Sequence, residues 1–227
     1  MTKHELQDIK KGWQDDDTAV SYDDLRFTTL IGKISDALDK VAIKKGLARI
    51  STDGMILDLP CGTGRIMEYL YRVGYKNIIG ADISEQMINV AKNKIQGKDQ
   101  VSFIRTEADR TEDPDGTFDA VSSIRFMGHI PREHRVKILR EFNRICKGLI
   151  IVEYSVRNPF ARRIKSLLRV LTVRGRLPSQ WKWHDVSHDE LELELKEAGL
   201  RVARLINKLP FLSESIFVVA EQSAKNS

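Results

Sequence analysis

From residue 55 onward, short apolar runs alternate with stretches whose apolar residues recur at helical spacing. The apolar runs predict strands that are covered on both faces, at 55–59, 77–82, 101–105, 118–123 and 149–154. The stretches between them predict helices at 64–72, 84–95 and 132–145, with Ser84 as an N-cap. Alternation of this kind indicates a parallel sheet with right-handed crossover connections.

The pattern changes after residue 186. Ser187 and Glu190 have the spacing of a capping box, which predicts the start of a helix. Two strand-like runs follow at 201–207 and 215–221, and the link between them is too short for a crossover helix. We therefore expect an α/β fold with a Rossmann-like, seven-stranded, mostly parallel sheet and an antiparallel last strand. Residues 1–50 are expected to form a helical cap before a domain that spans 51–227.

The composition is that of one globular domain. The chain has 227 residues, of which 41% are hydrophobic and 30% charged, and it is long enough to bury a substantial core. No apolar run is long enough to span a bilayer, and the first residues lack the pattern of a secretory signal. Cys61 and Cys146 are spaced neither as metal ligands nor as a disulfide framework. These features predict a cytoplasmic protein without a metal site.

The excess positive charge is concentrated in one segment. The formal net charge is +5, and residues 156–186 contain eight basic residues and one acidic residue. Asn158 and Pro159 favour a helix start, and the following apolar and basic positions predict a basic amphipathic helix over 158–176. Three interpretations stay open for this basic insertion. It can be a lid over the acceptor side, a contact with an anionic membrane surface or lipid headgroup, or a contact with nucleic-acid phosphates.

The stretch ILDLPCGTGR at 56–65 is the strongest candidate for a binding motif. Gly62 and Gly64 form a G-x-G pair, but Met67 stands at the third glycine position of a dinucleotide site, and no Walker lysine follows. Pro60 replaces the usual first glycine. The turn brings backbone N–H groups and a helix N-terminus to a ligand, which suits a carboxylate. An adenosine ligand with an amino-acid carboxylate and no phosphate fits, and S-adenosylmethionine is such a ligand.

This stretch resembles motif I of the class I S-adenosylmethionine-dependent methyltransferases, especially the ubiquinone/menaquinone-biosynthesis group. The resemblance covers about residues 53–155. It implies that Asp58 holds the methionine end, that Asp82 binds the ribose hydroxyls, and that Asp109 accepts from the adenine amino group. Ile83 and Met87 would flank the adenine. The cofactor-binding residues predicted in this way are Asp58, Pro60, Cys61, Gly62, Gly64, Asp82, Ile83, Met87, Asp109, Ser123 and Arg125.

The acceptor side is less well defined by the sequence. His129 follows the fourth predicted strand, and it is the first candidate for a general base; Glu153, at the end of the fifth, is the second. For both residues a structural role is an equally open interpretation. The residues predicted to line the substrate site or a lid are Tyr22, Arg26, Tyr154, Trp181 and Trp183.

The resemblance implies a methyltransferase that acts on a small-molecule or lipid-like acceptor. Nucleic acid is less favoured, because SSIRF replaces the Asn/Asp-Pro-Pro-aromatic turn that grips a flipped base in related enzymes. A cofactor-binding partner protein without catalysis is an alternative. A Rossmann-like oxidoreductase is another, although the missing third glycine argues against it. The expected location is cytoplasmic, with peripheral membrane contact through 158–176 as an open alternative.

Overall fold

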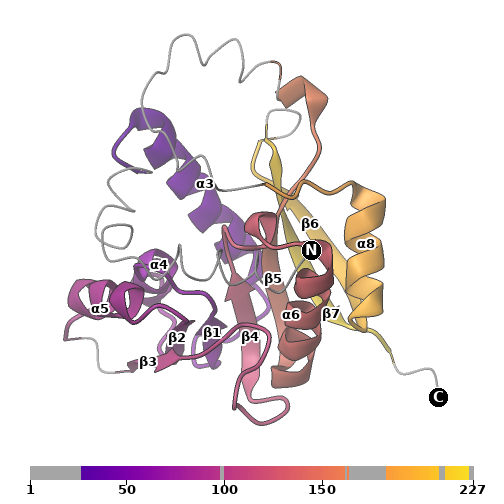
Figure 1. The fold of residues 1–227 in the computed structure, drawn as a ribbon. Helices are drawn as coiled ribbons and strands as arrows, with labels where there is room; N and C mark the ends of the chain where they lie inside the picture. The colour runs from indigo at the N-terminus through magenta and orange to yellow at the C-terminus, as the bar shows by residue number, and fades with distance from the viewer. Residues whose placement is uncertain (1–26, 98–99, 162, 164–182, 210–212, 225–227) are drawn as a thin grey trace.

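The computed structural model describes residues 27–97, 100–161, 163, 183–209 and 213–224. One seven-stranded sheet with the order β3-β2-β1-β4-β5-β7-β6 forms its centre (Figure 1). β1 to β5 pair in parallel, whereas β7 runs antiparallel to both β5 and β6. The fold class expected from the sequence is confirmed. The strands are β1 Ile56–Asp58, β2 Ile78–Asp82, β3 Val101–Arg105, β4 Phe118–Ser123, β5 Cys146–Ser155, β6 Leu200–Asn207 and β7 Ser215–Gln222.

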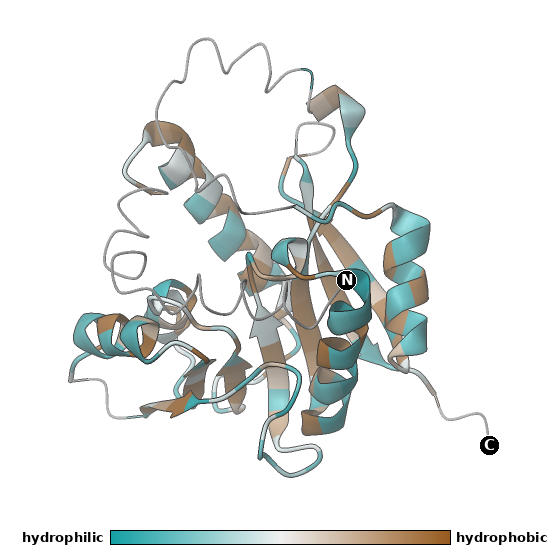
Figure 2. Cartoon of the chain, in the orientation of Figure 1, coloured by the Kyte–Doolittle hydropathy of each residue, from teal (hydrophilic) through white to brown (hydrophobic). Residues whose placement is uncertain are grey.

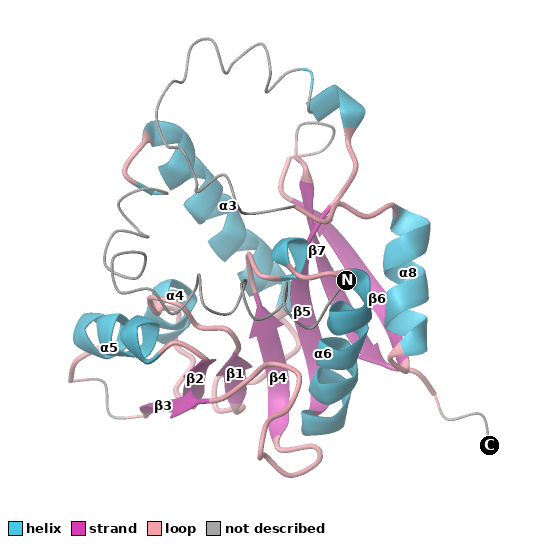
Figure 3. Ribbon diagram, in the orientation of Figure 1, coloured by secondary structure: helices cyan, strands magenta, loops and turns pink. Residues whose placement is uncertain are grey.

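Helices cover both faces of the sheet (Figure 3). Successive side chains of a strand point to opposite faces, so that Leu57 and Val121 join one buried cluster and Ile56 and Ala120 the other. α6 and α8 complete the first cluster, and α3 and α4 the second. The helices are α3 Leu30–Gly46, α4 Arg65–Arg72, α5 Glu85–Lys94, the 3-10 helix η1 Met127–His129, α6 Arg132–Ile145 and α8 His188–Glu197.

The helix caps that the sequence predicts at the starts of α5 and α8 are present in the structure. The Ser84 hydroxyl accepts from the Met87 amide at 3.2 Å at the start of α5. Ser187 and Glu190 form the expected capping box at the start of α8. β5 begins at Cys146, earlier than the apolar run at 149–154 predicts, because the chain becomes extended directly after α6. The loops that follow the carboxyl ends of the parallel strands therefore lie at one edge of the sheet, where ligand sites form in such folds.

Candidate functional site

A cavity lies at the carboxyl ends of β1, β2 and β4, where ligands bind in open parallel sheets. Its volume is about 1130 Å³ including the part open to solvent. Most of the residues predicted to bind the cofactor line this cavity. They are Asp58, Pro60, Cys61, Gly62, Asp82, Ile83, Met87, Asp109 and Arg125.

Asp58 ends β1 and is buried at the cavity wall. One carboxylate oxygen, Oδ1, accepts from the Ser122 hydroxyl at 2.6 Å. The other, Oδ2, has no hydrogen-bond partner among the described residues. Burial raises the pKa of Asp58 to about 7, although the Ser122 hydrogen bond opposes this. A buried carboxylate with an unused oxygen at a cavity fits a cationic ligand group, such as the ammonium of a methionine moiety.

Asp82 ends β2 and holds the motif I turn against α5. Its Oδ2 accepts from the Gly62 amide and its Oδ1 from the Ser84 amide, each at 2.9 Å. Burial raises the pKa of Asp82, while these backbone hydrogen bonds lower it. A carboxylate has about four lone-pair positions, so each oxygen can still accept from a ligand hydroxyl. The geometry therefore fits a ribose beside Asp82.

The backbone N–H groups of the turn are largely used within the protein. Cys61 donates to the Ala81 carbonyl at 2.8 Å, and Gly64 donates to the Cys61 carbonyl at 3.0 Å. Together with the Gly62 amide, these groups are engaged before any ligand binds. The expectation that the turn offers its amides to a carboxylate is wrong for these three residues. Burial also raises the pKa of the Cys61 thiol well above its usual value, which disfavours the reactive thiolate form.

The two motif glycines have different tasks. Both have left-handed backbones, with φ of 52° at Gly62 and 76° at Gly64. A Cβ on Gly64 would meet the Ala91 Cβ at 2.9 Å, so this glycine lets α4 approach α5. A Cβ on Gly62 would meet nothing within 4 Å. Gly64 does not line the cavity, and its role is to set the packing of the helix that bounds it.

This difference predicts unequal costs of substitution. Both Gly62→Ala and Gly64→Ala should lower the free energy of unfolding by about 1 kcal/mol, because each places a side chain on a left-handed backbone. Gly64→Ala should lose roughly 1 to 3 kcal/mol more, because its new methyl group overlaps α5. Urea unfolding of the two variants checks the order. Equal losses of unfolding free energy in the two variants would show that α5 can move away from the new methyl group at position 64 without cost.

Arg125 follows β4 and is fixed by partners from two elements, β5 and α3. Its backbone is left-handed, with φ of 58°, and its amide donates to Glu153 Oε2 at 3.0 Å. Its guanidinium donates to Asp39 Oδ2 at 2.9 Å and to the Ser35 hydroxyl at 2.8 Å. Arg125 therefore lines the cavity as a residue that is already paired with α3. Ser123, two residues earlier at the end of β4, is buried and is not among the lining residues.

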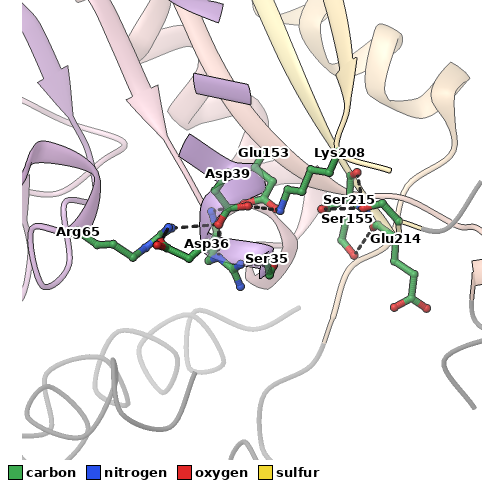
Figure 4. A network of polar contacts seen from close by, with 11 residues as sticks. Ser35, Asp36, Asp39, Arg65, Glu153, Ser155, Lys208, Glu214 and Ser215 are labelled. Carbon is green, nitrogen blue, oxygen red and sulfur yellow. Dashed lines mark hydrogen bonds and ion pairs between the residues drawn. The ribbon is translucent and has the colours of Figure 1, made fainter. Parts of the chain in front are cut away.

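These contacts belong to a buried charge cluster, which consists of Asp36, Asp39, Arg65, Arg125, Glu153 and Lys208 (Figure 4). Lys208, at the end of β6, binds both Asp39 and Glu153. Arg65 of α4 binds Asp36 and Asp39. The cluster joins α3 to the ends of β4, β5 and β6, and two of its arginines form part of the cavity wall.

Glu153 is one of these cluster residues, and its contacts argue against its predicted catalytic role. Burial alone would raise the pKa of Glu153, but Lys208 and Arg125 outweigh it and hold the pKa at about 2. A carboxylate with such a low pKa is a poor proton acceptor near neutral pH. Its contacts give Glu153 the task of holding the loop after β4.

Tyr154 and His129, which were also predicted for the acceptor side, do not line the cavity. Tyr154 is buried among the core residues on the α6 and α8 side, and its hydroxyl donates to Glu194 at 3.0 Å, so the prediction of a substrate or lid role is not supported. His129 is buried in η1, with its ring centroid 4.3 Å from that of Trp183. Tyr22, Arg26, Trp181 and most of the basic insertion lie outside the described residues.

Two residues of α6 line the cavity but were not predicted. His134 and Ile138 are four residues apart and therefore lie on the same side of the helix. The spacing of these two residues can be read from the sequence, but the sequence does not indicate that this side of α6 faces the cavity. The Nδ1 atom of His134 is buried and has no hydrogen-bond partner among the described residues.

Within the described residues, no group of three or more His, Cys, Asp or Glu side chains could hold a metal ion. In the same part of the chain, none of the helices combines the length and the hydropathy needed to cross a bilayer.

Comparison with known proteins supports the methyltransferase resemblance. A protein-family model described as a methyltransferase domain matches residues 56–148, which include the motif I turn and the ends of β1, β2 and β4. Residues 56–148 are thus similar to a methyltransferase domain, as the resemblance to the class I S-adenosylmethionine-dependent methyltransferases implies. This confirms the resemblance recognised in the sequence and, with it, S-adenosylmethionine as the cofactor of this family.

Individual relatives match only part of this chain. A demethylmenaquinone methyltransferase of Clavibacter sepedonicus is 34% identical over 107 residues, which is 47% of this chain and 42% of that protein. A ribosomal protein L11 methyltransferase of Thermotoga petrophila is 31% identical over 90 residues, 40% of this chain and 32% of that protein. The matched part thus spans less than half the length of these relatives.

The fold likeness extends over nearly the whole chain. The magnesium protoporphyrin IX methyltransferase of Synechocystis, solved with bound S-adenosylhomocysteine, has a TM-score of 0.75. It covers 96% of this chain and 100% of the solved chain at 15% identity. At this identity the likeness supports the methyltransferase fold alone, and the acceptor has to be inferred separately.

Proposed function

We propose that this chain transfers a methyl group from S-adenosylmethionine to a small-molecule or lipid-like acceptor. The observation that supports this most strongly is the unused Oδ2 of Asp58, a buried carboxyl oxygen in the wall of the cavity. Asp82 and Asp109 line the same cavity, so three acids meet a ligand that has a cationic end and hydrogen-bond donors along its length.

Each acid would bind a different part of the cofactor. Asp58 would hold the ammonium, Asp82 the ribose hydroxyls and Asp109 the adenine amino group, with Ile83 and Met87 against the adenine faces. When bound, the cofactor supplies a methyl group that its sulfonium activates. The chain would then align the acceptor with that methyl group and exclude water.

A base is needed only if the acceptor is a hydroxyl or a protonated amine. His129 is our candidate for this task, since Glu153 has a pKa of about 2. His129 lies in η1, directly after the loop of Arg125, and the exposed Trp183 packs against it.

The acceptor class rests on less direct support. Two proteins named above act, by their names, on demethylmenaquinone and on magnesium protoporphyrin IX, and the third acts on a ribosomal protein. We favour a small or lipid-like acceptor, because the sequence of 158–176 has the pattern of a basic amphipathic helix that contacts an anionic membrane.

Transfer from methyl-labelled S-adenosylmethionine into host-cell extract tests this proposal. The products are separated into organic-soluble, nucleic-acid, protein and small aqueous fractions. We expect label in the organic-soluble or small aqueous fraction. Label in protein or nucleic acid would overturn the acceptor class. Cofactor binding without label in any fraction, repeated with extracts of several growth states, would instead favour a cofactor-binding partner protein.

A further inference from the structure

The outer side of α3 exposes large apolar residues. The exposed fractions of Leu30, Ile31, Ile34 and Val41 are 75%, 57%, 50% and 48%. Positions 30, 34 and 41 lie within about 40° of one another around a helix of 3.6 residues per turn. They therefore form one stripe rather than scattered exposed side chains. Figure 2 shows hydrophobic residues at the N-terminal end of this helix.

The buried charge cluster explains why this stripe faces outward. A surface helix usually turns its apolar side to the core and its polar side to water. In the middle of α3 this is reversed, because Asp36 binds Arg65 and Asp39 binds Lys208 on the inner side of the helix (Figure 4). Asp39 also binds Arg125. The opposite, apolar side of the helix is thereby held toward the outside. Only near its end does α3 place apolar residues such as Ile43 in the core.

The charges on the two sides of α3 are also separated. Asp36 and Asp39 are the only acids within Leu30–Gly46, and both belong to the cluster. Lys33, Lys44 and Lys45 are exposed. The outward side of this helix thus combines apolar and positively charged residues, and it carries no acid that would repel an anionic surface.

We propose that this outward face, defined as Leu30, Ile31, Lys33, Ile34, Val41, Lys44 and Lys45, binds the surface of an anionic lipid bilayer. Helices with an apolar stripe beside basic residues lie in the interface of such bilayers, where the apolar side chains enter the acyl boundary and the lysines meet the headgroups. This contact goes beyond the proposed methyl transfer and does not depend on it. The face would add to a membrane contact of the basic insertion, which is one of the three interpretations of that segment.

Co-sedimentation of the full chain with lipid vesicles measures the contact. Vesicles of phosphatidylcholine mixed with phosphatidylglycerol are compared with vesicles of phosphatidylcholine alone. The wild-type chain should bind the anionic vesicles, bind the neutral ones much less, and lose affinity as salt increases. Absence of binding to the anionic vesicles would overturn the proposal.

Matched variants separate α3 from the rest of the surface. Ile34→Gln should weaken vesicle binding about tenfold, because an apolar side chain no longer enters the bilayer. Leu193→Gln on α8 is its control, since Leu193 is also 50% exposed, and it should change nothing. Lys44→Gln should weaken binding about fivefold, whereas Lys196→Gln on α8 should not.

Two further outcomes would contradict the proposal. Binding that is equal in wild type and Ile34→Gln would place the contact elsewhere in the chain. A wild-type dimer in sedimentation velocity that Ile34→Gln dissociates would make the stripe an interface between copies. Thermal unfolding and S-adenosylmethionine affinity, which these exposed substitutions should leave unchanged, distinguish a lost surface from a lost fold or a failed cofactor assignment.

Discussion

Asp58→Asn is expected to weaken S-adenosylmethionine binding by roughly a hundredfold or more, because it removes the charge that faces the ligand ammonium in a buried site. The asparagine oxygen can keep the hydrogen bond from Ser122, so the shape of the wall should be preserved. Isothermal titration of both proteins at pH 8 measures the ratio. Equal affinities would remove Asp58 from the cofactor site.

The pKa of Asp58 makes this prediction depend on pH. Because burial raises the pKa to about 7, Asp58 in the empty cavity takes up a proton as the pH falls below 7. The ammonium requires the ionised form, so wild-type affinity should fall by about tenfold per pH unit below 7. Asp58→Asn should lack this dependence. Titration in buffers of different ionisation enthalpy would detect the proton that binding releases.

The same carboxyl should reduce stability at high pH. A folded-state pKa of about 7 lies above the ordinary value of 3.8 for this group, so the contribution of Asp58 to stability is fully present below pH 3.8 and is lost as the pH rises through 7. Asp58→Asn should therefore unfold at a higher urea concentration than wild type at pH 8. A variant that binds less and is more stable has not lost binding through misfolding.

Asp39→Asn should cost roughly 3 to 5 kcal/mol of unfolding free energy, because it leaves buried cations without their counter-charge. Asp39 is fully buried, and it binds Arg125 at 2.9 Å, Arg65 at 3.2 Å, and Lys208. Urea unfolding at neutral pH measures the loss.

Asp53→Asn is the control for this variant. Asp53 forms an ion pair with Lys76 at 3.0 Å, but its side chain is 69% exposed. An exposed pair of this kind contributes less than about 1 kcal/mol, so the control should unfold almost as wild type does. Similar losses in the two variants would show that the charge cluster does not hold α3.

The strand and helix pattern could be predicted because apolar periodicity is local. The runs at 101–105 and 118–123 coincide with β3 and β4, and the helical pattern at 132–145 coincides with α6. The acids at the ends of β1 and β2 follow from the same pattern, since the carboxyl ends of neighbouring parallel strands lie at one edge. Their roles in cofactor binding stay predictions.

The buried charge cluster could not be predicted, because its partners are far apart in the sequence. Arg125 and Asp39 are 86 residues apart, and Lys208 and Glu153 are 55 apart. In a sequence each of these residues resembles an ordinary surface charge. Side-chain direction at a strand end was also misjudged for Tyr154. Adjacent strand residues point to opposite faces, so Glu153 meets the α3 side and Tyr154 meets Glu194 of α8.

The central claim is that the cavity at the ends of β1 and β2 binds S-adenosylmethionine through Asp58. Calorimetric titration of the wild-type chain with S-adenosylmethionine at pH 6 and pH 8 tests it most directly. One site per chain is predicted, with roughly tenfold weaker binding at pH 6 and proton release that is larger there. Absence of binding at both pH values, or an affinity that does not change between them, would contradict this account.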